Sequence, residues 1–486
     1  MIIKPLALLS VAAAALATPI FTQELAPVHG EPHVQGLTDP RVHNSYIVVL
    51  KDGVETTSHH SHINSLLAKR SNGGRFGHVY NLEHAGESIF NGYAIHDVDE
   101  ETINALRARP EVDHIERDSI VHTQEVYHGL DAEAEEDSVT QKNAPWGLAR
   151  ISHHDPLSLS TFNKYVYDPH GGEGVSVYVV DTGINTHHVE FEGRAHWGKT
   201  IPANDVDEDG NGHGSHCAGT IGSRKYGVAK KAELFAVKVL GSNGSGTMSD
   251  VVGGVLWAAQ DAKRKADAAA EELRTTGKTS HKGSVANMSL GGGKSPSLDR
   301  AVNKAVESGL TFAVAAGNDD RDACDYSPAS AEKAVTVGAS TLWDERAYFS
   351  NVGKCVDIFA PGLNILSTWN SGPHSINTIS GTSMASPHTA GALAYLLSLH
   401  SHAAHKSFSE ELYNTALNTV FDTIGGFMPG WLDLFKPKPA APISPPEPVS
   451  PAFLKKSLLD LAGRGYLTDV EQGSPNLLLF NNATKA

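Results

Sequence analysis

The chain has 486 residues, 40% of them hydrophobic, which is enough apolar sequence for a sizeable core and for more than one folding unit. Its 39 Lys and Arg residues against 55 Asp and Glu residues give a formal net charge of -16. That charge repels nucleic acids and anionic membrane surfaces, so neither is expected as a partner.

The first 17 residues predict a cleavable signal peptide. A lysine is followed by a short apolar run and by the small-residue pattern Ala15-Leu16-Ala17. The alternative, a membrane anchor, needs roughly 20 apolar residues, and this run is shorter. We therefore expect the chain to enter the secretory pathway and to reach the extracellular space or a vacuole lumen.

Residues 43–122 predict a small α+β domain. Apolar patterns indicate strands at 45–50, 77–83, 92–98 and 112–121, and helices at 62–69 and 100–110. This βαββαβ order is the ferredoxin-like arrangement, which by itself names no function. The acidic segment that follows, 123–142, is typical of an exposed linker, and we expect maturation cleavage within it.

Residues 143–486 predict an α/β domain. Short β-branched runs such as "VSVYVVD" and "LFAVKVL" alternate with helical stretches, which favours a doubly wound, mostly parallel sheet with helices on both faces. Functional sites of such sheets lie at the C-terminal ends of the strands. A proline-rich stretch at about 400–451 predicts a surface insertion, and whether it is cut, glycosylated or simply tolerated stays open. A last helix and strand follow it.

Several polar residues stand where a catalytic site would need them. Asp181 ends an apolar strand, His213 lies in the Gly-rich "NGHGSHC", and Ser383 lies in "SGTSMASPH". Alone, each has an ordinary explanation as a turn aspartate, a surface histidine or a helix-capping serine. Together they supply a nucleophile, a base and an orienting carboxylate. Asn318, just past a strand, adds an amide that can donate to an oxyanion.

The second histidine of this stretch, His216, leaves two alternatives open. His213 and His216 have spacing that can bind zinc, but the stretch lacks the His-Glu-x-x-His pattern that supplies ligands and a base together. Spacing alone also does not decide which of the two histidines is the base.

Five segments in this order, "VVDTG", "NGHGSHCAGT", "NMSLGGG", "AAGN" and "GTSMASPH", resemble the signature segments of the subtilisin-like serine proteases. The resemblance is closest to the proteinase K branch, with its fungal vacuolar and secreted members, and it covers the chain from residue 143 onward. Residues 43–122 resemble the inhibitory propeptide of that family. The resemblance implies a serine endopeptidase made as a zymogen, with Asp181, His213 and Ser383 as the triad and Asn318 with the Ser383 backbone amide as the oxyanion hole.

The resemblance also implies how substrates are bound. The matching positions are Gly244, Ser245, Gly246, Ser289, Leu290, Gly291, Ala315, Ala316 and Gly317. None of them carries a charge, which favours a broad hydrophobic or aromatic preference for the P1 residue, the one before the cleaved bond. Protein substrates and the chain's own propeptide are the expected partners, and the protein is expected to be a monomer.

Metals and cysteines complete what the resemblance implies. The chemistry of the family needs no cofactor, but Asp357 matches a carboxylate that binds structural calcium in the proteinase K branch. The acidic loop at 204–212 is a second candidate for calcium, although solvated charge explains it equally well.

Cys324 and Cys355 flank the strand "AVTVGAS" and are expected to pair, which leaves Cys217 as a free thiol.

Two other functions make different predictions for the same residues. A catalytically dead homologue that acts as a binding protein predicts the loss of a triad residue, and none is lost. A processing convertase with narrow basic specificity needs carboxylates in its P1 pocket, and the matching segments offer none.

Overall fold

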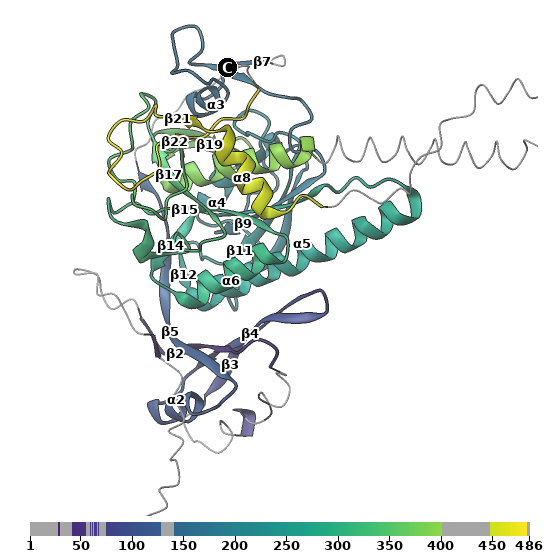
Figure 1. Cartoon of the computed structure of the whole chain (residues 1–486), viewed down its shortest axis with the longest axis vertical. Coiled ribbons are helices and arrows are strands. Elements are labelled where there is room, and N and C mark those ends of the chain that lie inside the picture. Colours follow the sequence, from purple (N-terminus) through teal and green to yellow (C-terminus); the bar gives the residue numbers. More distant parts are fainter. Residues whose placement is uncertain are drawn as a thin grey trace, which may run out of the picture.

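The computed structural model describes residues 28–29, 41–54, several positions of 59–67, 74–127, 140–400 and 448–483. The predicted signal peptide, linker residues 128–139 and insertion residues 401–447 lie outside the described residues. So does part of the first predicted propeptide helix, although its described positions between 59 and 67 are helical. Figure 1 shows a small sheet domain below a larger α/β domain, with strand β5 running from one to the other.

The small domain contains an antiparallel sheet in the order β5-β2-β4-β3. Its elements are β2 (Arg41–Leu50), β3 (Arg75–His84), β4 (Glu87–His96), α2 (Glu100–Arg107) and β5 (Val112–Thr123), and β1 (Val28–His29) pairs with β5. This is the ferredoxin-like order predicted from the sequence. Asp99 caps α2 by accepting a hydrogen bond from the Thr102 N–H at 2.8 Å. One face of the sheet buries Val48, Ile95 and Ile115 beneath the helices.

The large domain is built on a sheet that is parallel throughout except for its last pair of strands. Its order is β10-β11-β9-β13-β15-β17-β18-β22-β21. The strands are β9 (Val175–Asp181), β10 (Ala195–Thr200), β11 (Glu233–Lys238), β13 (Gly283–Met288), β15 (Thr311–Ala315), β17 (Val335–Ser340), β18 (Ile358–Pro361), β21 (Gly463–Arg464) and β22 (Leu477–Leu478). Every residue of β9 is buried, as expected for a strand covered on both faces.

Helices cover both faces of this sheet, as the sequence predicted. Alternate residues of β9 contribute to two different cores: Val177 and Val179 to one, Tyr178 and Val180 to the other. The first core is closed by α4 (His213–Gly222), by a helix at 382–400 and by α8 (Pro451–Leu461). The second is closed by α5 (Met248–Thr276) and α6 (Pro296–Glu307). None of the described helices is long and apolar enough to cross a membrane.

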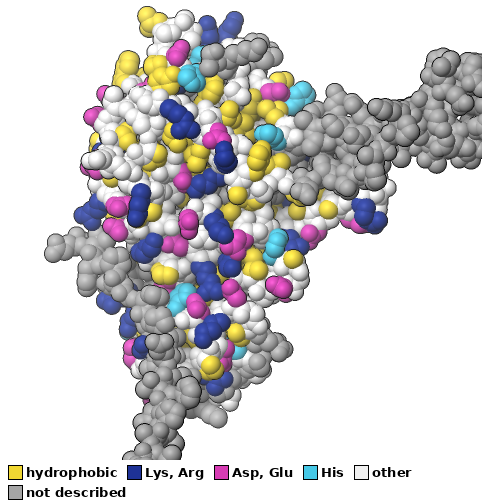
Figure 2. All heavy atoms as spheres, in the orientation of Figure 1, with side chains coloured by type: hydrophobic (Ala, Val, Ile, Leu, Met, Phe, Trp, Pro, Cys, Tyr) yellow, Lys and Arg dark blue, Asp and Glu magenta, His cyan; other side chains and the backbone are white. Residues whose placement is uncertain are grey.

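Short elements surround the ends of the main strands. They are α3 (Trp146–Ile151), β6 (Val126–Tyr127), β7 (Thr140–Lys142), β8 (Lys164–Val166), η1 (Val189–Phe191), β12 (Ser245–Thr247), β14 (Leu290–Gly293), η2 (Ala323–Asp325), β16 (Tyr326–Ser327), β19 (Ile365–Thr368) and β20 (Ile376–Ser380). A disulfide joins Cys324 to Cys355, and Cys217 is a buried free thiol. On the face in Figure 2, acidic and basic side chains are interspersed among the described residues.

Candidate active site

Asp181 and His213 meet at the C-terminal end of the parallel strands. Asp181 is the last residue of β9, His213 is the first residue of α4, and both side chains are fully buried. His213 Nδ1 lies 2.7 Å from Asp181 Oδ1, which also accepts a hydrogen bond from the Thr182 N–H. The carboxylate therefore holds the proton on Nδ1 and leaves Nε2 as the basic atom. Nε2 has no hydrogen-bond partner among the described residues.

Asp209, which sequence reasoning treated only as part of an acidic loop, fixes the start of α4. Its carboxylate accepts hydrogen bonds from the Ser215 N–H at 2.9 Å, from the Ser215 hydroxyl at 2.6 Å and from the Thr182 hydroxyl at 2.8 Å. These bonds satisfy a free N–H of the first helical turn and tie it to the end of β9. Asp209 thereby sets the position of His213 relative to Asp181.

The charge on His213 is set by competing influences. Burial disfavours the imidazolium, yet the pKa of His213 is raised well above its usual value by the Asp181 carboxylate, with a smaller contribution from the Glu125 carboxylate. Glu125 Oε2 lies 4.0 Å from His213 Nε2. Burial raises the pKa of the Cys217 thiol to about 11, so this sulfur is protonated near neutral pH and is a poor nucleophile.

His216 has a different role from His213. It is fully buried, and its Nε2 lies 2.8 Å from the Ile365 carbonyl oxygen. Burial lowers the pKa of His216 to about 3, so the ring is neutral. The structure therefore places His213 beside the carboxylate and His216 against the backbone of β19.

Ser383 and Asn318 lie next to each other across the start of the helix at 382–400. Asn318 Oδ1 accepts hydrogen bonds from the N–H and the hydroxyl of Thr382, both at 2.9 Å. Because the amide oxygen is used in this way, the Nδ2 group is turned away from Thr382, and it has no hydrogen-bond partner among the described residues. Thr382 was not singled out from the sequence, yet it orients the amide.

The chain itself runs between Ser383 and Ser289 at Gln124, in what we call the cleft. The Ser383 N–H donates to the Gln124 carbonyl oxygen at 3.3 Å, and the Gln124 N–H donates to the Ser289 carbonyl oxygen at 3.3 Å. A Cβ at Gly381 would lie 2.4 Å from that Gln124 oxygen and 3.3 Å from Asn318 Nδ2, so only glycine allows this approach. Two potential oxyanion donors, the Ser383 N–H and Asn318 Nδ2, therefore lie near one carbonyl.

The hydroxyl of Ser383 is turned away from the base in this arrangement. Ser383 Oγ donates to the Ser289 carbonyl oxygen at 2.9 Å. It makes no hydrogen bond to His213 Nε2, which has no partner among the described residues. The serine and the histidine are therefore not joined by a hydrogen bond in this arrangement.

Strand β5 occupies the cleft as an extended peptide would. It pairs antiparallel with β12 on one side and with β14 on the other. The Thr123 N–H donates to the Gly244 carbonyl oxygen at 3.0 Å, and Gly291 lies opposite His122. Beyond the crossing, β6 pairs with β20, so the chain is bound on both sides of Gln124. This is recognition by strand addition, in which main-chain hydrogen bonds hold the peptide.

The predicted substrate-binding residues fall into two groups. Those at 244–246 and 289–291 belong to the segments that pair with β5. Ala315, Ala316 and Gly317 instead lead from β15 to Asn318, where the Gly317 N–H donates to the Thr382 hydroxyl at 3.1 Å.

Val121 marks an apolar subsite that the sequence analysis missed. When Gln124 is counted as the first residue, Val121 is the fourth toward the N-terminus. It is fully buried and belongs to the same hydrophobic core as Met248 and Leu290. A Cβ at Gly292 would lie 3.3 Å from Val121, so the glycine leaves room for this side chain.

Two buried carboxylates of β5 bind the starts of two helices in the large domain. Asp118 accepts hydrogen bonds from the Ser249 N–H at 3.0 Å and from the Ser249 hydroxyl at 2.7 Å, in the first turn of α5. Glu116 accepts from the Ser297 N–H at 2.9 Å, in the first turn of α6. Helix N-termini attract negative charge and have unpaired N–H groups. Burial raises the pKa of both carboxyls, because it removes water from their charged forms. Part of the favourable interaction with the helix N-termini therefore compensates for this loss of hydration.

The two predicted calcium positions are engaged by other groups. Asp357 Oδ2 accepts a hydrogen bond from Lys455 Nζ at 2.8 Å, away from the catalytic cluster. In the acidic loop, Asp207 accepts from the Thr200 hydroxyl at 2.7 Å, and Asp205 lies 3.5 Å from Lys238 Nζ.

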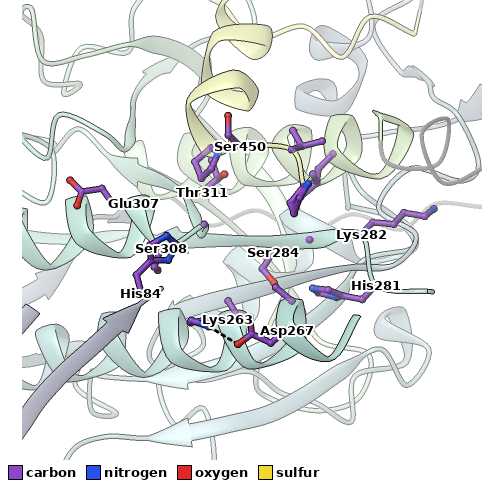
Figure 3. Close-up of a pocket in the computed structure, with 18 of the residues that line it drawn as sticks. His84, Lys263, Asp267, His281, Lys282, Ser284, Glu307, Ser308, Thr311 and Ser450 are labelled. Carbon is purple, nitrogen blue, oxygen red and sulfur yellow. Dashed lines mark hydrogen bonds and ion pairs between the residues drawn. The ribbon is translucent and has the colours of Figure 1, made fainter. Parts of the chain in front are cut away.

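A separate cavity of about 500 Å³ lies beside the first residues of β13 and β15 (Figure 3). It is bordered by α5, by the C-terminal end of α6 and by the start of α8, with His84 of the small domain at its rim. None of Asp181, His213 and Ser383 lines it. The groups suited to chemistry therefore belong to the cleft between β12 and β14.

The cleft can carry out acyl transfer. Ser383 Oγ can attack a carbonyl carbon while His213 Nε2 takes the hydroxyl proton and Asp181 stabilises the imidazolium. The Ser383 N–H and Asn318 Nδ2 are placed to bind the negative oxygen that forms. His213 can then return the proton to the leaving amine.

Comparisons with known proteins agree with this geometry. Residues 172–436 match the Subtilase family model, and residues 45–124 match the Peptidase inhibitor I9 model, whose match ends at Gln124. Subtilisin-like serine protease Cur l 4.0101 from Cochliobolus lunatus is 56% identical over 96% of this chain and 85% of its own length. Subtilisin-like serine protease Pen c 2 from Penicillium citrinum is 51% identical over 93% of this chain and 90% of its own length. A solved cold adapted subtilisin-like serine proteinase is 39% identical, with a TM-score of 0.53, and the match covers 71% of this chain and 100% of that one.

Proposed function

Because this chain belongs to the subtilase family of serine proteases and carries an inhibitory propeptide, we propose that it is made as a zymogen that first cuts its own Gln124–Glu125 bond. One observation carries this proposal. The Gln124 carbonyl oxygen accepts the Ser383 N–H hydrogen bond, while the chain continues uncut to β6. The alternative of a catalytically dead homologue has no support, because all the catalytic groups are present and lie together.

The proposed reaction proceeds through an acyl-enzyme. Ser383 Oγ bonds to the Gln124 carbonyl carbon, and its proton passes to His213. The C–N bond to Glu125 then breaks as His213 gives that proton to the new amine. Water, activated by His213 in turn, releases the Gln124 carboxylate and restores Ser383. Asn318 and the Ser383 N–H stabilise the oxyanion in both halves of the reaction.

For other substrates, we propose uncharged P1 residues, with hydrophobic and aromatic side chains preferred. The residues assigned to the P1 pocket carry no charge. The uncharged side chain of Gln124, which is the P1 residue of the proposed first cut, donates from its Nε2 to the Gly291 carbonyl oxygen at 3.3 Å. The burial of Val121 supports an apolar preference at P4. Acidic P1 binding groups, which basic residues need, are absent from the assigned positions.

The proposed setting is the secretory pathway, with the mature enzyme acting as a monomer in the extracellular space or a vacuole lumen. The apolar segment at residues 1–17 supports this route. The proposed steps use only groups of the chain itself and water.

The test is a time course of precursor processing. We expect the first products to be a propeptide that ends at Gln124 and a chain that begins at Glu125, identified by intact mass and N-terminal sequencing. The matured enzyme should then hydrolyse a chromogenic peptide with Phe at P1 faster than the same peptide with Lys at P1. A first cut at another bond contradicts the cleavage site, and a preference for Lys contradicts the proposed specificity.

Glu125 should influence the pH dependence of this first cut. Self-cleavage needs neutral His213, so its rate rises as pH passes upward through the raised pKa of His213. Replacing Glu125 by Gln removes one of the negative charges that raise this pKa. We therefore expect the pH of half-maximal processing to fall in Glu125→Gln, measured as first-order rates of precursor loss from pH 5 to 9.

The matched control is Glu87→Gln, an exposed change on the small domain. It should process like the unmodified precursor at every pH. The mature enzymes from all three proteins should share one pH profile on a peptide substrate, because cleavage frees residue 125, the new N-terminus, from its place beside His213. An unchanged processing profile in Glu125→Gln would remove Glu125 from the control of His213.

A further inference from the structure

Lys455 is enclosed by oxygen atoms at the N-terminal edge of β17 and β18. Its Nζ donates to the Ala334 carbonyl oxygen at 2.5 Å, to Asp357 Oδ2 at 2.8 Å and to the Glu332 carbonyl oxygen at 3.2 Å. An ammonium group has three N–H donors, so these three acceptors satisfy it completely. We call Asp357 Oδ2 and the two carbonyl oxygens of Glu332 and Ala334 the oxygen cluster.

The rest of the chain holds Lys455 firmly in this position. Lys455 lies on α8, the first helix after residues 401–447, where Ser450 caps the helix by accepting from the Phe453 N–H. Leu454 and Leu458 of the same helix are buried in the core beneath it. Asp357 is fixed as well, because its Oδ2 also accepts from the Thr336 N–H at 2.8 Å. The ammonium therefore meets a preformed cluster.

The oxygen cluster has the composition of a cation site. A carboxylate and two backbone carbonyls are ligands that calcium prefers in proteins. The lysine and a metal ion exclude each other, however, because the ammonium uses all three oxygens and would repel a divalent ion placed among them. The calcium implied for Asp357 by the family resemblance therefore does not fit this chain.

We propose that Lys455 is a built-in cation that takes the place of a divalent metal ion at the oxygen cluster. It fastens α8 to the edge of β17 and β18 through a cation that is covalently part of the chain and therefore cannot be lost to solvent as a bound metal ion can. A metal-bound version of the same cluster would loosen whenever the metal concentration falls. At this position the attachment of the C-terminal segment is therefore independent of calcium.

The test removes the ammonium and asks whether a metal site appears. Lys455→Met keeps most of the side-chain length, and the full-length chain should also carry Ser383→Ala so that proteolysis does not disturb the measurement. Thermal unfolding is followed in EDTA and in increasing CaCl2. We expect Lys455→Met to have a lower Tm in EDTA than its parent and to gain Tm with calcium in a saturable way, because a ligand that binds only the folded state stabilises it.

Three further proteins make the outcome specific. Lys456→Met removes the neighbouring, exposed lysine, which pairs with Asp460, and should respond to calcium as the parent does. Adding Asp357→Asn to Lys455→Met should abolish the calcium response gained by the single change. If Lys455→Met does not fold, Lys455→Gln serves the same comparison. A calcium response no larger than that of the parent, in whichever Lys455 variant folds, overturns the proposal.

Discussion

Ser383→Ala is expected to abolish peptide hydrolysis and to leave a precursor that stays uncut between Gln124 and Glu125. The change removes the nucleophile, and for subtilisin, a member of the same family, such a loss lowers kcat by about 10⁶. The Gln124 carbonyl still receives the backbone N–H of residue 383 and β5 still pairs with β12 and β14, so the propeptide should remain bound. Intact mass of protein purified from a protease-deficient host measures the result.

Ser371→Ala is the matched control, since Ser371 is an exposed serine of the same domain. It should mature and hydrolyse peptides normally. A single cooperative thermal unfolding transition of the uncut Ser383→Ala precursor would show that it is folded. If the Ser383→Ala precursor matured at the usual rate in that host, another protease would be responsible for the first cut, and self-processing would be wrong.

Asn318→Ala is expected to lower kcat by roughly 10²–10³ with little change in KM, an effect of the size known for the oxyanion-hole asparagine of subtilisin. The amide donates to an oxygen whose negative charge develops in the transition state, whereas the bound substrate gains less from it. Asn318→Asp should be at least as damaging, because it keeps the shape of the side chain but replaces the donor with an acceptor. Steady-state kinetics on a chromogenic peptide measure both parameters.

The control for this series is Asn303→Ala on α6, where the side chain accepts from the Lys333 N–H at an exposed position. It should leave kcat unchanged. Loss of the Thr382 hydrogen bonds in Asn318→Ala costs about 1 kcal/mol of folding free energy per bond, so the assay temperature must stay well below Tm. A variant that is folded and retains full kcat would exclude Asn318 from the oxyanion hole.

Much of this architecture was predictable because its signals are local. The β-branched runs of the large domain and the strand-helix-strand order of the small one follow directly from residue patterns. Asp181, His213, Ser383 and Asn318 each stand at the end of a strand or the start of a helix, and parallel strands bring such ends to one edge of a sheet.

The remaining features depend on contacts between distant segments. Residue patterns alone predict a propeptide domain that ends at His122 and a cut somewhere in 123–142. The register of β5 against β12 and β14, which no local pattern gives, decides which carbonyl meets Ser383. The pairing of Lys455 with Asp357 joins residues on either side of the proline-rich insertion, and no local pattern reveals it. The orientation of the Asn318 amide likewise depends on Thr382.

The uninterrupted path of the chain from β5 through the cleft to β6 gives the proposed self-cleavage a definite kinetic order. On this proposal each precursor contains both the bond to be cut and the serine that cuts it, so the first cleavage should be a first-order event. Its half-time is unchanged when the precursor is diluted, whereas cutting of one molecule by another slows in proportion to dilution. On this proposal the onset of proteolysis depends on the conditions that each molecule meets, such as the pH, and not on the amount of enzyme that has accumulated.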